Sequence, residues 1–60
     1  DFITISTEEK IEKVQLFDIS GNLVQSEKSN NFSIESLSTG VYIIDVKVPS
    51  GMYRTRLVKN

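Results

Sequence analysis

The feature of this chain that most restricts its fold is a two-residue alternation in residues 40–60, which read GVYIIDVKVPSGMYRTRLVKN. In the first half of this segment every second side chain is large and apolar: Tyr42, Ile44, Val46 and Val48. Side chains two apart share one face of a strand, so this half is predicted to be a strand with one apolar face. Pro49-Ser50-Gly51 predicts a turn, and the polar, basic residues after it form the return strand. We therefore expect a β-hairpin across residues 40–60.

Four shorter β-runs precede this hairpin, at residues 2–5, 11–18, 23–27 and 31–34. Ser20-Gly21-Asn22 predicts a tight turn, because glycine adopts positive φ without steric cost. Residues 35–39 are too few for an independent helix and are expected to form a turn that places Leu37 in the core. Six β-runs separated by turns predict an all-β fold, a small antiparallel β-sandwich of the immunoglobulin-like kind with six to seven strands. A helix start at residues 6–11 is the weaker alternative, since Ser or Thr ahead of Glu suits an N-cap.

The length of the chain, 60 residues, allows one small domain. Such a domain must offset about 90 kcal/mol of ordering entropy, so its stability should be small. There is no cysteine, so neither a disulfide nor a thiolate metal site can add to it. With a net charge of −1, the chain has no overall positive charge that would attract nucleic acid or an anionic membrane. The chain starts at Asp1 without a secretory leader, and we expect residues 1–60 to be one domain of a larger secreted protein.

Catalytic chemistry has little support in this composition. There is no histidine, and the eight carboxylates are spread over expected loops and polar strand faces. No nucleophile, base and orienting group occur together, so we expect no enzyme activity and no cofactor. Asp18 and Ser20 resemble part of a calcium loop, but the further oxygen ligands and the bidentate Glu are missing. The favoured interpretation is a turn in which Asp18 accepts hydrogen bonds from backbone N–H groups, with no metal.

Tyr42 and Tyr53 are a candidate aromatic platform for a sugar. Tyr42 is in register with the apolar face of its strand and should point inward, with its hydroxyl at the rim. Tyr53 shares a face with Thr55 and Leu57 and is the one aromatic expected to be accessible.

Two segments together resemble a known family. Residues 14–24 read VQLFDISGNLV, and residues 37–42 read LSTGVY, followed by the Ile/Val-rich strand, Gly51 and the terminal RLVK of residues 56–59. With these segments in this order and spacing, the chain resembles the type A C-terminal sorting domain of the type IX secretion system of Bacteroidetes. This system is also called the Por secretion system. The resemblance covers essentially the whole chain. The Pro-Asn-Pro segment that commonly precedes the first strand in this family is absent here.

The resemblance implies a secretion signal that carries an N-terminal cargo domain through the type IX outer-membrane translocon. It further implies that a sortase-like peptidase removes the domain and attaches the cargo to lipopolysaccharide, so that the cargo ends on the cell surface after crossing the periplasm. We expect Asp18 and Gly21 to define a turn of the fold. The residues expected to take part in signal recognition are Gly40, Tyr42, Gly51, Arg54, Arg56, Leu57, Val58 and Lys59.

Within that set we expect two roles. Tyr42 and Leu57 should stabilise the fold, whereas Arg54, Arg56 and Lys59 are the better candidates for contact with the machinery. Bare strand edges also allow an edge-strand dimer. The alternative function is an accessory β-sandwich that spaces domains or binds glycan. A spacer would be followed by more sequence, and a glycan module would need an exposed aromatic face.

Overall fold

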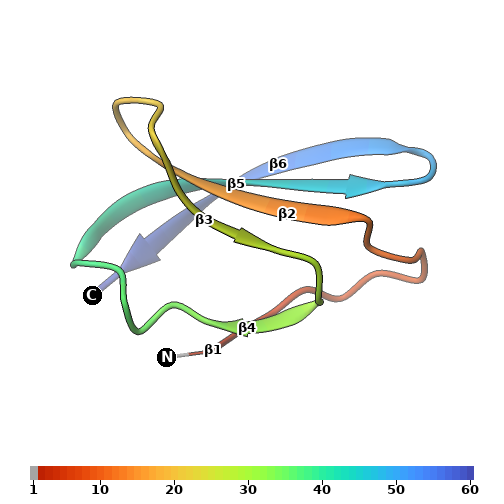
Figure 1. Cartoon of the computed structure of the whole chain (residues 1–60), viewed down its shortest axis with the longest axis horizontal. Coiled ribbons are helices and arrows are strands. Elements are labelled where there is room, and N and C mark those ends of the chain that lie inside the picture. The colour runs from red at the N-terminus through yellow and green to blue at the C-terminus, as the bar shows by residue number, and fades with distance from the viewer. Residues whose placement is uncertain (1) are drawn as a thin grey trace.

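The computed structural model describes residues 2–60 and is all-β (Figure 1). The elements, in chain order, are β1 (Phe2–Thr4), β2 (Lys13–Asp18), β3 (Leu23–Glu27), β4 (Asn31–Ser33), β5 (Gly40–Val48) and β6 (Gly51–Lys59). The six expected β-runs are confirmed, although β1, β2 and β4 are shorter than predicted. Residues 6–12 contain no helix, so the alternative of a helix start there is wrong.

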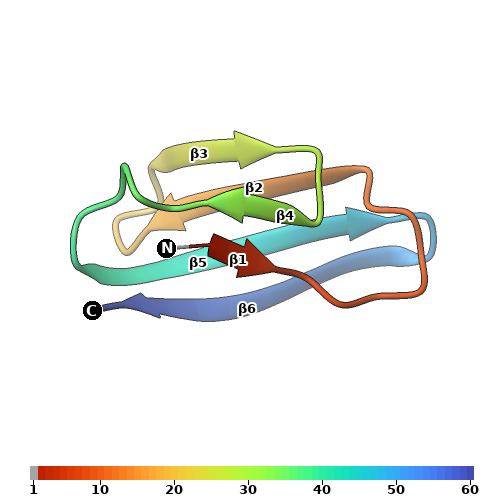
Figure 2. The same cartoon turned by 90° about the horizontal axis from the view of Figure 1, so that it is seen from below.

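The strands form two antiparallel sheets that pack face to face. We call the four-stranded sheet, with the order β3-β2-β5-β6, the large sheet, and the pair β1-β4 the small sheet. Figure 2 shows the small sheet lying over the middle of the large one, with β6 extending to one side. The predicted small antiparallel sandwich is confirmed, in the form of two strands on four.

The core lies between the two sheets and follows the predicted alternation. Leu16 and Val14 of β2 are fully buried, and β5 contributes every second residue. The small sheet and the loop after it add Phe32 and Ile34. Leu37 packs against this cluster from the loop between β4 and β5, as predicted. Ile11, which was expected to begin a strand, lies in the preceding loop and still packs on the core, because burial of an apolar side chain does not require a strand.

The turn between β2 and β3 is built around one carboxylate. Asp18 Oδ1 accepts hydrogen bonds from the backbone N–H groups of Ser20 and Asn22, both at 2.9 Å. Gly21 has φ +90°, a conformation that other L residues rarely adopt. The donors hold the pKa of the Asp18 carboxyl below its usual range, since they stabilise the charged form. Asp18 and Gly21 thus lie in the turn between β2 and β3, one as hydrogen-bond acceptor and the other with positive φ.

Polar contacts close the sandwich on its β3 side and at one end. Gln25 Nε2 of β3 donates to the carbonyl of Ser33 in β4 at 2.8 Å, which links the two sheets. Glu9, in the loop after β1, accepts hydrogen bonds from the backbone N–H (3.1 Å) and hydroxyl (2.6 Å) of Ser50. The loop between β1 and β2 is thereby tied to the β5–β6 turn.

Candidate functional site

The β5–β6 hairpin is the longest element pair of the fold and includes all eight candidate recognition residues. Its strands pair without interruption from Gly40↔Lys59 to Val48↔Gly51. Pro49 and Ser50 form the turn, where proline's fixed φ suits the first turn position, and Gly51 follows with φ +148°. β6 has β5 as its single neighbour in the sheet, so its other edge keeps unpaired backbone groups within the described residues.

An ion pair joins the two strands at mid-length. Asp45 and Arg54 are directly opposite each other, and the guanidinium binds the carboxylate through Nε at 2.6 Å and Nη2 at 2.9 Å. This bidentate hydrogen bonding lowers the pKa of the Asp45 carboxyl and raises that of Arg54. It also explains why Asp45, on the outward face of β5, is 7% exposed. Arg54 already has a partner in its own hairpin, so it is less available to an external one.

Lys59 clamps the loop between β4 and β5. Its Nζ donates to the carbonyl oxygens of Ile34 at 2.8 Å, Glu35 at 3.3 Å and Leu37 at 2.6 Å. A lysine ammonium has three donors, and all three are directed at one turn of backbone. Lys59 therefore stabilises the fold in this structure, in addition to any part in recognition.

Arg56 and Val58 differ from Lys59 in being open to solvent. They lie on the outward face of β6, opposite Ile43 and Val41. Among residues 2–60 no hydrogen bond or ion pair involves the Arg56 guanidinium. Of the three basic candidates, Arg56 is the one whose charge has no partner in the described part of the chain.

The Leu-Ser-x-Gly-x-Tyr segment forms a tyrosine corner. Tyr42 is buried, and its hydroxyl donates to the carbonyl of Ser38 at 2.6 Å, four residues back in the chain. The Leu37 N–H donates to Ile34 O at 3.0 Å, which turns the preceding loop. In immunoglobulin-like sandwiches a tyrosine placed in this way fixes the corner between two sheets. Tyr42 thus points inward, as expected, and its polar tip has a structural partner.

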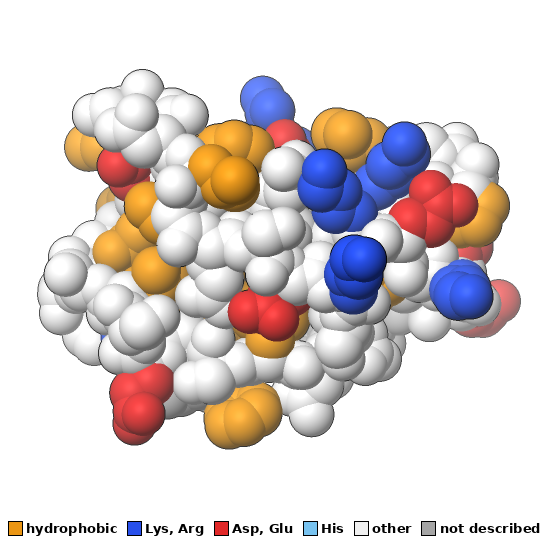
Figure 3. Space-filling view, viewed as in Figure 1, with side chains coloured by type: hydrophobic (Ala, Val, Ile, Leu, Met, Phe, Trp, Pro, Cys, Tyr) orange, Lys and Arg blue, Asp and Glu red, His pale blue; other side chains and the backbone are white. Residues whose placement is uncertain are grey.

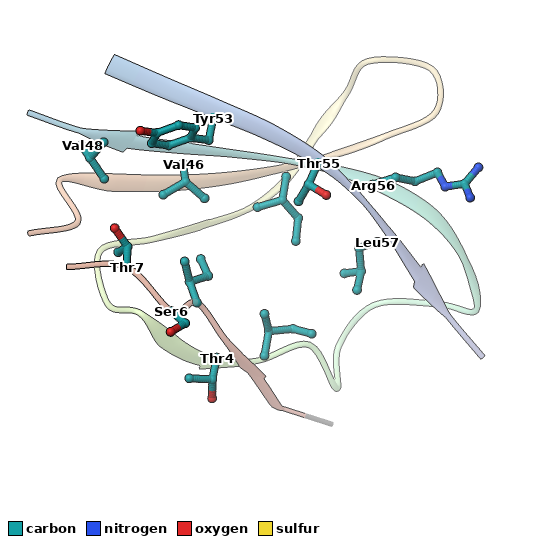
Figure 4. Close-up of a pocket in the computed structure, with 12 residues that line it drawn as sticks. Thr4, Ser6, Thr7, Val46, Val48, Tyr53, Thr55, Arg56 and Leu57 are labelled. Carbon is teal, nitrogen blue, oxygen red and sulfur yellow. The ribbon is translucent and has the colours of Figure 1, made fainter. Parts of the chain in front are cut away.

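A groove opens between β1 and β6, on the side where the small sheet has no third strand (Figure 4). Its volume is about 490 Å³, and its floor is formed by β5. Tyr53, Thr55 and Leu57 alternate along its β6 wall. Tyr53 is 59% exposed, which confirms that this aromatic is accessible. The opposite wall is residues 3–7.

Comparison with known proteins then decides the family. A family model described as the secretion system C-terminal sorting domain matches residues 1–60, the whole chain. The chain belongs to this family. As a sorting domain of type IX secretion, it acts with that machinery and is exported to the outer membrane or cell surface. No curated protein and no solved structure gave a significant match.

The family to which this chain belongs is one of sorting signals and is not an enzyme family. The described residues hold no group of three or more His, Cys, Asp or Glu side chains arranged for a metal ion. Residues 2–60 also contain no helix long and apolar enough to cross a membrane.

The sorting domain has structural features that could not be predicted from the sequence. The groove arises from the unequal size of the two sheets, which no local pattern reports. The carbonyl partners of Lys59 are more than twenty positions away in the chain. The Asp45–Arg54 pair, by contrast, could have been predicted from the sequence. Once the turn is placed at Pro49-Ser50, the antiparallel register puts these two residues opposite each other.

Proposed function

We propose that this sorting domain directs a cargo protein, joined N-terminal to it, through the type IX outer-membrane translocon, and that the machinery reads its β6 side. The observation that carries the proposal is the unpaired edge of β6 beside the apolar groove. Such an edge can accept an additional strand through backbone hydrogen bonds, while a pocket beside it selects side chains.

The arrangement of the hairpin fits this use. The Arg54–Asp45 pair fastens β6 at mid-length and Lys59 fastens it at its end, so both contacts restrain its free edge. Arg56 and Val58 extend from its outward face, and Tyr53 and Thr55 face the groove. A partner that adds to β6 would meet all of these side chains, and preorganisation lowers the entropic cost of that association.

We further infer that a sortase-like peptidase removes the domain and attaches the cargo to surface lipopolysaccharide. β1 begins and β6 ends toward the same end of the sandwich in Figures 1 and 2. A cleavage point upstream of β1 would therefore lie near the end of the recognised strand. The peptidase chemistry belongs to the machinery, and the sorting domain is its substrate.

Deletion of residues 56–60 from a cargo fusion tests the recognition step in a host with type IX secretion. The expected result is a cargo retained in the periplasm. Because the deletion also removes the Lys59 clamp, it is paired with Arg56→Met, which leaves the clamp in place. Normal secretion of both variants would contradict recognition at the β6 end. Mass spectrometry of the surface cargo tests processing, since an uncleaved C-terminal domain would contradict the peptidase step.

A further inference from the structure

The outward face of the large sheet carries a second feature, which includes Arg56 and Val58 of β6 and extends across β5 and β2. Strand register arranges its side chains in rows across β2, β5 and β6. One row is Lys13–Lys47–Met52, and the next is Gln15–Asp45–Arg54. The third is Phe17–Ile43–Arg56, extended by Leu23 of β3, and Val41–Val58 forms a short fourth row. We call these four rows the outer face.

The apolar rows of the outer face are open to solvent. Leu23 is 52% exposed, Val58 51% and Val41 38%. Ile19, just beyond the end of β2, is 79% exposed. Solvent-facing sides of antiparallel sheets are normally polar, and clustered exposed apolar side chains mark interaction surfaces.

A hollow of about 280 Å³ lies within these apolar rows. It is lined by three apolar residues, Phe17, Ile19 and Ile43, together with Asp18, Gly21 and Arg54. Its size suits one large apolar side chain, in the way that a single anchor residue fills a pocket at a protein interface.

The charge of the outer face is opposite to that of the rest of the molecule. Its rows hold four basic side chains, Lys13, Lys47, Arg54 and Arg56, and one carboxylate, Asp45, a net charge of +3. Since the whole chain has a net charge of −1, the remaining surface is acidic. In Figure 3 most of the visible Lys and Arg side chains lie in the right half of the view, with Asp and Glu side chains among them.

Part of this positive charge does nothing for the fold. Lys13 and Lys47 are directly opposite each other on neighbouring strands, an arrangement that is unfavourable for like charges. Both are exposed, and neither side-chain ammonium donates a hydrogen bond within residues 2–60. An acidic partner would convert this repulsion into attraction.

We propose that the outer face docks on an acidic protein surface that inserts one apolar side chain into the Phe17–Ile43 hollow. The proposal rests on the proposed function, and it assigns the partner's chemistry within the secretion machinery. A protein fits better than a lipid surface, because lipid recognition typically uses clusters of about 4–8 Lys or Arg, whereas three uncompensated cations are present here.

Backbone-amide NMR of the isolated domain tests the chemistry with defined probes. The probes are two synthetic peptides with a central leucine, identical except that glutamates in one are lysines in the other. The glutamate peptide is expected to shift the amide resonances of Phe17, Ile43 and Arg56, and added salt should weaken this binding. The lysine peptide should not bind. Absence of glutamate-peptide binding, or shifts confined to Ile5 and Leu57 in the groove, would overturn the proposal.

The same spectra distinguish the other occupants of this face. Equal or tighter binding of phosphatidylglycerol vesicles would overturn the proposal in favour of a lipid surface. Outer-face shifts that grow with the concentration of the domain alone would overturn it in favour of a second copy of this chain.

Charge reversal in cells separates this inference from the proposed function. The Lys13→Glu/Lys47→Glu variant of a cargo fusion changes no residue of β6 and should lose at least about tenfold of its surface-exposed cargo, since like charges across an interface are strongly unfavourable. The matched control, Lys10→Glu/Lys28→Glu, makes the same change in net charge away from the outer face and should keep normal export. Thermal melts verify that both variants fold. Equal export of both overturns the docking proposal alone, whereas failure of the unmodified fusion overturns the proposed function as well.

Discussion

The sharpest consequence of the structure concerns Lys59, whose charge is predicted to stabilise the fold. In Lys59→Met the aliphatic stem is retained and the three Nζ hydrogen bonds are lost. Two of these bonds are partly buried, those to Ile34 and Leu37. At about 1 kcal/mol net for each partly buried bond, the variant should lose about 2 kcal/mol of unfolding free energy. A domain of this size has about 3–9 kcal/mol in total, so its melting temperature should fall by about 8–16 °C.

Urea denaturation followed by far-ultraviolet circular dichroism measures this loss, since the chain has no tryptophan to report by fluorescence. Arg56→Met is the matched control, because it removes one positive charge from the same strand where no intramolecular partner is described. Its unfolding free energy should stay within about 0.5 kcal/mol of the parent value. Equal stability of Lys59→Met and the parent domain would refute the clamp, and an equal loss in both variants would show that net charge is the cause.

Three further predictions each concern a single residue. Tyr42→Phe removes the hydrogen bond to Ser38 and should cost about 1 kcal/mol in chemical denaturation, and an unchanged denaturation midpoint would argue against the tyrosine corner. Gly21→Ala meets no atom within 4 Å but must adopt φ +90°, so it should destabilise by about 1–2 kcal/mol; a gain in melting temperature would contradict this. The lowered pKa of the Asp45 carboxyl means that its stabilisation is present above the unfolded pKa of about 4 and is lost as pH falls through the folded value. The difference in melting temperature between about pH 7 and about pH 2 should therefore be smaller in Asp45→Asn than in the parent domain. An equal difference in both would count against the ion pair.

Local patterns predicted most of the fold. The alternation along β5 correctly assigned its buried face, because side chains two apart must share one side of a strand. Ser20-Gly21-Asn22 correctly predicted a turn, because Gly21 has the positive φ and the nearby Asp18 accepts a hydrogen bond from the Asn22 N–H. Leu37 was correctly placed in the core from its isolated apolar character within a polar loop.

Features that depend on how distant strands assemble could not be predicted in this way. Basic residues in the last strand were expected to face the machinery, yet Arg54 pairs with Asp45 and Lys59 binds backbone carbonyls. The groove exists because the small sheet covers β5 and leaves β6 open, which is a property of sheet order and not of any one segment. The outer face likewise becomes a continuous patch only when register aligns residues such as Phe17 and Ile43.

If this domain is sufficient as a sorting signal, it should carry an unrelated protein to the cell surface. A periplasmic reporter is joined ahead of residues 1–60 and expressed in a host that has the type IX machinery, with a translocon-deficient strain as the comparison. We expect protease-accessible reporter on the surface of the first strain and periplasmic reporter in the second. A reporter that stays in the periplasm of both strains, while the fused domain is folded and intact, would contradict it.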